Sequence, residues 1–168
     1  MKTSEKQWTS LMKKLSLTLS SFIIIFLSIS NFSYSNEKNI IKGKAVIIDG
    51  DTIKINGKKI RFGGIDSPER GEIGHQFSKD KLLEKIGKKI VICFKEKNKD
   101  YWNRIIAECF IENENISSYM VKNGYACDYV KYSNEKYAKE EEYAKSNKLG
   151  IWKMKYNPRW EKKCIKNK

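Results

Sequence analysis

The sequence predicts a mainly β domain with helices (α+β content), and three observations support this fold class. Five short runs of β-forming residues follow one another along the chain, a helical segment separates the third run from the fourth, and two further helical segments follow the fifth. Five short strands with a helix in this place are typical of the five-stranded Greek-key barrel called the OB-fold. We therefore expect that barrel with three helices.

The first three strands are predicted from apolar β-forming runs and from the turn between two of them. The runs are NIIKGKAVIIDG (39–50), DTIKI (51–55) and KKIRFGGI (58–65), and the last two flank Asn56-Gly57. Asn-Gly is the strongest short signal for a β-hairpin, because both residues accept the positive φ that a two-residue turn requires. The second and third strands should therefore pair, with their far ends side by side.

The remaining elements are expected in the order helix, two strands, helix, helix. The helices are indicated by apolar residues on one face and by their ends, with Asn115 as an N-cap and Gly87 and Gly124 as stops. The expected bounds are 77–87 for the first helix, 88–97 and 104–113 for the strands, and 115–124 and 134–150 for the other helices. An irregular tail is expected from about residue 151.

Residues 1–35 have the layout of a secretory signal peptide. The segment Met12–Lys14 supplies positive charge, Leu15–Ile29 is apolar and uncharged, and Ser33 and Ser35 are small residues where a signal peptidase reads the chain. The apolar stretch is shorter than the roughly 20 residues that span a bilayer as a helix. We expect cleavage after about Ser35 and export of a single domain, residues 36–168, to a periplasm, cell surface or medium. The alternative is an uncleaved anchor that tethers the domain to a membrane.

The charge of the chain indicates a polyanionic partner. The 34 basic and 20 acidic side chains give a formal net charge of +14, and removal of residues 1–35 takes away four lysines and one glutamate, which leaves +11. Such a domain attracts nucleic acid, anionic lipid or acidic glycans. Charge alone does not choose among them, and a lysine-rich surface also serves solubility.

All four cysteines follow the expected signal peptide. An even number of cysteines in an exported chain favours disulfides over a metal site, and the lack of a C-x-x-C pair argues against a zinc ribbon. Cys93 and Cys109 lie in the fourth and fifth predicted strands, where facing positions would let them form a bridge. The pairing of Cys127 and Cys164 stays open.

Carboxylates are the first candidates for chemistry, because the chain has little histidine. His75, the single histidine, is expected to be a surface loop residue, and a cluster of histidine metal ligands is excluded. Asp51 begins the second strand and Asp66 ends the third, so the hairpin would place them side by side. Two close carboxylates repel unless a cation joins them, and an all-oxygen site suits Ca²⁺ or Mg²⁺.

Arginines are the second candidates. Arg61 and Arg104 lie within or beside predicted strands, in a chain whose basic residues are mostly lysines. A guanidinium group holds phosphate oxygens by two-point contacts and keeps its charge. Arg61 would point away from Asp66 on an ideal strand, but a bulge at Gly63-Gly64 could correct the phase. The alternative is that both arginines are ordinary charges at strand ends.

Together these residues resemble the staphylococcal nuclease (thermonuclease) family, and in particular its exported bacterial members. The matching segments are IDGDT (48–52), IRFGGIDSPE (60–69), the final R of DYWNR (100–104), VKNGYA (121–126) and KLGIW (148–152). The pair D-G-D-T and I-D-x-P-E, in this order and spacing, is specific. Where the family usually has D-[KR]-Y-G-R, this chain has Trp102 for tyrosine and Asn103 for glycine; asparagine tolerates left-handed backbone, so the turn can survive.

The resemblance implies an OB-fold endonuclease that depends on calcium and hydrolyses the phosphodiester bonds of DNA and RNA with little sequence preference. The implied roles fall on six residues: the metal ligands Asp51, Asp66 and Ser67 (through its backbone carbonyl), the general base Glu69, and the phosphate clamps Arg61 and Arg104.

A single strand is the expected form of the substrate, with bases stacked on Trp102, Tyr129 and Tyr132. The alternative from another class is a catalytically inactive OB-fold module that binds nucleic acid or protein. No stable protein partner is implied, and a monomer is expected. A membrane is a partner only if the signal segment stays uncleaved.

Overall fold

The computed structural model describes residues 39–154 and Cys164. The chain divides into two units, residues 1–39 and 40–168, and apart from Asn39 the described residues all lie in the second. The predicted signal peptide and most of the predicted irregular tail therefore lie outside the described residues. In the part of the chain that the structure describes, no helix has the length and apolar character that a membrane crossing requires.

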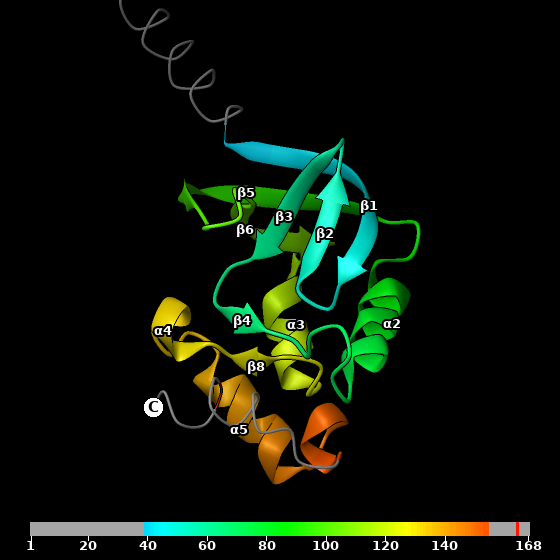
Figure 1. Ribbon diagram of the computed structural model, residues 1–168, viewed down its shortest axis with the longest axis vertical. Helices are drawn as coiled ribbons and strands as arrows, with labels where there is room; N and C mark the ends of the chain where they lie inside the picture. Colours follow the sequence, from blue (N-terminus) through cyan, green and yellow to red (C-terminus); the bar gives the residue numbers. More distant parts are fainter. Residues whose placement is uncertain (1–38, 155–163, 165–168) are drawn as a thin grey trace, which may run out of the picture. The chain divides into compact units, whose positions relative to one another are not determined.

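Five strands close into a barrel (Figure 1). The strands are β1 (Ile40–Asp49), β2 (Thr52–Ile55), β3 (Lys58–Phe62), β5 (Ile90–Lys99) and β6 (Ile105–Ile111). Antiparallel pairing runs from β3 through β2, β1 and β5 to β6, and a parallel pairing of β3 with β6 completes the circle. The predicted five-stranded OB-fold barrel is confirmed.

Alternating side chains of the hairpin fix which face of each strand is buried. Ile53, Ile55, Ile60 and Phe62 are fully buried, and the lysines that alternate with them are exposed. Successive side chains of a strand point to opposite faces, so a slip of one residue would bury lysine in place of isoleucine. Arg61 lies between Ile60 and Phe62 and therefore points away from the barrel interior.

The three predicted helices are present, with shifted ends. They are α2 (His75–Ile86), α3 (Ile116–Lys122) and α5 (Ala138–Ser146), and the described residues also contain the short helices α4 (Val130–Ser133) and η1 (Gly150–Lys153), which were not predicted. Asn115 caps α3 as expected, since its side chain accepts the Ser118 N–H at 3.0 Å. The last predicted helix starts late because Asn134 and Glu135 have φ of 53° and 61°, outside the helical range.

A small ribbon outside the barrel carries one of the candidate site residues. In it, β4 (Ile65–Asp66) pairs antiparallel with β8 (Cys127–Asp128), and Asp66 lies opposite Cys127. The predicted single strand over 58–65 is therefore wrong, because the chain turns at Gly63-Gly64 and leaves the barrel. A further short strand, β7 (Glu114–Asn115), pairs antiparallel with the end of β6. The helix α2 packs against β1, and α3 packs against β6 and α5.

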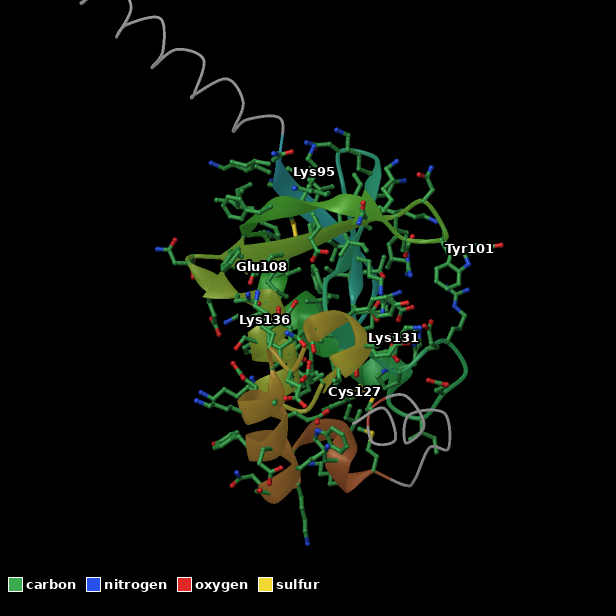
Figure 2. All side chains as sticks on the ribbon, turned by 90° about the vertical axis from the view of Figure 1, so that its left-hand side faces the viewer. Lys95, Tyr101, Glu108, Cys127, Lys131 and Lys136 are labelled. Atoms are coloured by element: carbon green, nitrogen blue, oxygen red, sulfur yellow. A yellow bond between two sulfur atoms is a disulfide. The ribbon has the colours of Figure 1, made fainter. Side chains whose placement is uncertain are left out.

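Both cysteine pairs form disulfides. Cys93 and Cys109 face each other across β5 and β6 with their Cα atoms 4.0 Å apart, and their bridge lies inside the barrel (Figure 2). This pairing confirms the prediction. Cys127 is bonded to Cys164, with Cα atoms 5.9 Å apart, so the second bridge ties the C-terminal segment to the strand that pairs with Asp66.

We predict that removal of the barrel disulfide destabilises the fold measurably. The bridge joins residues 16 positions apart, and a cross-link of this loop length contributes about 3 kcal/mol to the free energy of unfolding. The double variant C93A/C109A should lose about that amount in urea unfolding followed by tryptophan fluorescence. Wild-type protein under reducing conditions should lose at least as much, because both bridges then open. A variant with an unchanged urea midpoint and slope would contradict the prediction.

Candidate active site

Two buried carboxylates converge on one arginine. Arg61 in β3 places its Nη1 at 2.6 Å from Asp51 Oδ2 and its Nη2 at 3.0 Å from Asp66 Oδ1. Nη2 also donates to the backbone carbonyl of Ile65 at 3.0 Å. Asp51 is 3% exposed and Asp66 is fully buried. The hairpin and the ribbon thus bring together the two aspartates and the arginine that the sequence indicated.

Two glycines make this convergence possible. Gly64 has φ of +73°, a conformation that glycine adopts without steric cost, and the turn that it forms lets Arg61 and Asp66 face each other although they lie five residues apart. The phase is thus corrected by a turn and not by the expected bulge. Gly50, between Asp49 and Asp51, allows close packing, because a Cβ there would lie 2.8 Å from Ser67 Oγ.

The charges of the cluster leave it negative overall. Burial by itself lowers the pKa of Arg61, but Asp51 and Asp66 outweigh burial and raise this pKa above its ordinary value, so the guanidinium stays charged. Two carboxylates against one guanidinium leave one net negative charge. Asp51 is held further by the Thr52 hydroxyl, which donates to Oδ1 at 2.8 Å, and by the Ser67 N–H, which donates to Oδ2 at 3.2 Å.

The donor set fits a hard divalent cation. Asp51 and Asp66 present carboxylate oxygens in a cluster with a net negative charge, which is the chemistry that Ca²⁺ and Mg²⁺ prefer. Over residues 39–154 and Cys164, no three His, Cys, Asp or Glu side chains are grouped so as to hold a metal ion. An ion held by the two aspartates would therefore take its other ligands from a backbone carbonyl, such as that of Ser67, and from water. Hard cations accept both kinds of ligand.

Arg104 reaches the same region from the neighbouring strand, because β6 pairs with β3. It precedes β6, and its Nη1 donates to Thr52 Oγ1 at 3.3 Å, so it is linked through that hydroxyl to Asp51. Its Nε and backbone N–H donate to the two carboxylate oxygens of Asp100 at 2.5 and 2.8 Å. Although burial raises the pKa of Asp100, the hydrogen bonds from Arg104 lower it below its ordinary value. An ionised Asp100 therefore holds Arg104 in place.

Glu69 lies in the loop between β4 and α2, three residues after Asp66. Its backbone N–H donates to Glu72 Oε2 at 2.7 Å, and the Glu72 N–H donates back to the Glu69 carbonyl at 2.9 Å. These two hydrogen bonds close a turn. The half-buried Glu69 is thus placed by hydrogen bonds of its loop, whereas Asp51 and Arg61 are placed by the barrel.

The predicted stacking residues come from two separate segments, the β5–β6 loop and α4. Trp102 is 72% exposed in the β5–β6 loop, and the Arg104 guanidinium lies 5.1 Å from the centre of its ring. Its neighbour Tyr101 projects away from the barrel (Figure 2). Asn103 has φ of 61°, so asparagine does preserve the left-handed turn that the family pattern fills with glycine.

Tyr129 and Tyr132 lie at α4, beside the Gly63-Gly64 turn. Their rings contact each other edge to face with centroids 4.9 Å apart, and the Tyr129 N–H donates to the Gly64 carbonyl at 2.9 Å. Tyr132 also lines a cavity of about 270 Å³ together with Gly63 and Phe94. Lys136 and Glu108, labelled in Figure 2, line it too and form an ion pair of 2.6 Å. This second aromatic pair therefore contacts the turn that follows Arg61, and Trp102 contacts Arg104.

The prediction for His75 is wrong. This histidine is not a surface loop residue: it begins α2, and its side chain is 13% exposed. Its Nδ1 lies 3.2 Å from the carbonyl oxygen of Pro68 and 3.0 Å from Asp49 Oδ1. Burial, and then the charge of Asp51, raise the pKa of Asp49, and His75 opposes them. A lone histidine carries no local pattern, so only the fold shows these contacts.

Comparisons with known proteins agree with this site. Residues 59–154 match the family described as staphylococcal nuclease homologue. An uncharacterized endonuclease of Haemophilus influenzae is 33% identical over 142 residues, which cover 81% of this chain and 78% of that protein. Endonuclease YncB of Bacillus subtilis is 34% identical over 122 residues (62% and 58%), and the succinoglycan biosynthesis protein ExoI of Rhizobium meliloti is 27% identical over 124 residues (67% and 65%).

The barrel and the matches define a hydrolase of the nuclease class built on an OB-fold. The chain belongs to the family of staphylococcal nuclease homologues, as the resemblance of its motifs implied. Nucleases of this family depend on a metal ion, which agrees with the oxygen-rich cluster around Asp51. The individual roles of the six site residues stay predictions.

We predict that Arg61→Ala destabilises the folded state strongly in the absence of metal. The change leaves two buried carboxylates without their shared cation, and breaking a buried ion pair in this way costs about 3–5 kcal/mol. The loss would be measured by urea unfolding in the presence of a chelator. Millimolar Ca²⁺ should restore part of it, because the ion can neutralise the same carboxylates. Arg70→Ala, at an exposed arginine, is the control and should change stability by less than about 0.5 kcal/mol. Equal, small effects of both changes would contradict the prediction.

Proposed function

We propose that this nuclease is an exported, calcium-dependent endonuclease that hydrolyses the phosphodiester bonds of DNA and RNA with little sequence preference. The observation that carries the proposal is the convergence of Asp51 and Asp66 on Arg61. It gathers two buried carboxylates and a guanidinium at one point of a rigid barrel, with Arg104 linked to the same point through Thr52.

Asp51, Asp66 and the Ser67 carbonyl are the proposed ligands of calcium. A bound calcium ion would offset the charge of the phosphodiester and would position and activate the attacking water. The negative charge of the cluster and its oxygen donors support this assignment, since both favour a hard divalent ion. The anchoring of Asp51 by Thr52 and Ser67 keeps one ligand carboxylate in a fixed orientation.

Arg61 and Arg104 are the proposed phosphate clamps. Each guanidinium keeps its charge and offers two N–H groups in a plane that matches two phosphate oxygens. Their acidic partners, Asp51 and Asp66 for Arg61 and Asp100 for Arg104, hold both groups in place before a substrate binds. Fixed positive charge of this kind stabilises the additional negative charge of the transition state, which is usually the largest catalytic contribution.

Glu69 is the proposed general base. A carboxylate accepts the proton of the water that attacks phosphorus, and a well-placed base of this kind contributes about 10²- to 10⁴-fold to the rate. The position of Glu69 three residues beyond the ligand Asp66, in a turn closed by Glu72, supports the role. The role requires a loop that holds the carboxylate near the cluster formed by Arg61.

Single strands are the proposed preferred form of the substrate. Trp102 in the β5–β6 loop and Tyr132 in α4 are 72% and 65% exposed, so each offers a large aromatic face. Bases of any identity stack on such faces, which gives binding without sequence preference. A duplex keeps its base faces stacked inside, so a single strand should bind better. The net charge of +11 on residues 36–168 favours DNA and RNA alike.

Export through the N-terminal segment is supported by the two disulfides. Disulfides persist in oxidising compartments and are rare in the cytosol, and all four cysteines of this chain are bonded. The proposed mature enzyme is a monomer that starts near residue 36 and needs no stable protein partner. An uncleaved segment would tether the same enzyme to a membrane surface.

We expect the purified protein to cleave single-stranded DNA and RNA with Ca²⁺, duplex DNA more slowly, and neither in a chelator. Glu69→Gln should lower kcat by about 10²- to 10⁴-fold and leave substrate binding intact. Glu84→Gln changes an exposed glutamate of α2 and should keep full activity. Cleavage that survives the chelator would contradict the metal site, and activity with Mg²⁺ but not Ca²⁺ would contradict the choice of ion. Binding without cleavage under every condition would favour the inactive OB-fold module.

We expect the full chain, expressed in a bacterial host, to lose its first 35 or so residues on export. Intact-mass measurement of protein from the periplasm or medium should give a chain that begins near residue 36 and carries two disulfides. A chain that retains Leu15–Ile29 and sediments with membranes would show the anchored alternative.

A further inference from the structure

We infer that His75 is a positioning residue for the catalytic loop: its imidazole clamps the Pro68 backbone, next to Glu69, against Asp49 at the end of β1. The inference deepens the proposed function and rests on the proposed role of Glu69 as the base. The clamp itself is a structural arrangement that can be tested without activity.

The contacts of the ring define which nitrogen carries the hydrogen. Nδ1 lies 3.2 Å from the Pro68 carbonyl oxygen and 3.0 Å from Asp49 Oδ1. The Pro68 carbonyl oxygen has no hydrogen and can only accept a hydrogen bond, and so can the carboxylate of an ionised Asp49. The hydrogen must therefore lie on Nδ1, which is the donor. Both the neutral ring with its hydrogen on Nδ1 and the imidazolium donate from this atom, so the clamp does not require a charged histidine.

Both sides of the clamp are themselves fixed. Asp49 ends β1, and its Oδ1 accepts the Gly50 N–H at 3.1 Å. His75 is the first residue of α2, which packs against β1. Gly74 before it has φ of +91°, and a Cβ there would lie 3.2 Å from Pro68 Cγ. The missing side chain at residue 74 thus lets the start of α2 approach Pro68 closely.

The clamp completes a set of ties around Glu69. On the N-terminal side, the Ser67 N–H donates to Asp51 Oδ2 at 3.2 Å. On the C-terminal side, the Glu69–Glu72 turn is followed by a hydrogen bond from the His75 N–H to the Glu72 carbonyl at 3.2 Å. The side chain of His75 then returns to Pro68, between these two anchors. Glu69 is therefore held between a tie to a proposed metal ligand and a tie to α2.

Loss of the clamp should affect the chemical step more than substrate binding. Arg61, Arg104 and the exposed aromatic residues bind the substrate in the proposal, and none of them contacts His75 through the hydrogen bonds described above. A shift of about 1 Å in a reacting group can lower a rate by about 100-fold. We therefore expect a lower kcat with KM for single-stranded DNA, and the Ca²⁺ concentration for half-maximal rate, changed by less than about twofold.

The experiment compares three substitutions at one position. His75→Asn places an amide N–H near the position of Nδ1 and can still donate to Pro68, whereas His75→Gln places it near Nε2, and His75→Ala removes the donor. Relative to wild type, the Gln and Ala variants should lose about 10- to 100-fold in kcat, and the Asn variant should recover most of this loss. Gln76→Ala, an exposed neighbour that contacts Asp80, should match wild type.

A second measurement tests the clamp without activity. Amide hydrogen exchange of Glu69, whose N–H is bonded to Glu72, should be faster in the Gln and Ala variants than in wild type and the Asn variant. A thermal midpoint within about 3 °C of wild type would show that the fold is intact. Unchanged kcat and unchanged Glu69 exchange in the Gln and Ala variants would overturn the inference, and so would an Asn variant as impaired as Gln. If wild type cleaves no nucleic acid, the proposed function fails, and the exchange pattern still decides whether the clamp exists.

Discussion

The guanidinium of Arg61 is the contact around which the candidate site is arranged. Buried carboxylates are tolerated only when they are paired, so Asp51 and Asp66 must reach the same cation. Asp51 reaches it through the pairing of β2 with β3, and Asp66 through the turn at Gly63-Gly64. The parallel pairing of β3 with β6 holds Arg61 in the wall of a closed barrel, and this gives the cluster a rigid support.

The cluster of Asp51, Asp66 and Arg61 is compatible with a stable fold and also with binding of a cation. Its one net negative charge is tolerated because Asp51 also accepts hydrogen bonds from Thr52 and Ser67. That residual negative charge favours the binding of a divalent cation at the same oxygens. The arginine thus offsets the mutual repulsion of the two carboxylates that are proposed to hold the metal, and its guanidinium would attract a phosphate to the same place.

The parts of the site that could be predicted depend on short-range signals. Asn56-Gly57 fixes the hairpin, the hairpin fixes the neighbourhood of Asp51, and the motif around Asp66 fixes the loop that follows. The split of the third strand, the pairing of β4 with β8 and the Cys127–Cys164 bridge could not be predicted. The Gly63-Gly64 pair marks an irregularity in the third strand but not the direction in which the chain leaves the barrel. The β4–β8 pairing and the disulfide depend on contacts between segments far apart in the sequence, 37 residues for this disulfide, and neither has a local pattern.

Some residues of the site are held in place by the barrel, whereas Glu69 is held by hydrogen bonds of its loop. This difference is the reason for the positioning role that we infer for His75. Asp51, Arg61 and Arg104 are attached to barrel strands, whose packed interior limits their movement. Glu69 belongs to a loop in which only Ser67 and Pro68 are buried between Asp66 and His75. Such a loop has little apolar packing to order it and opens easily unless its backbone is tied. The position of Glu69 therefore depends on hydrogen bonds, and the donor at the start of α2 supplies one at Pro68, the residue next to this proposed base.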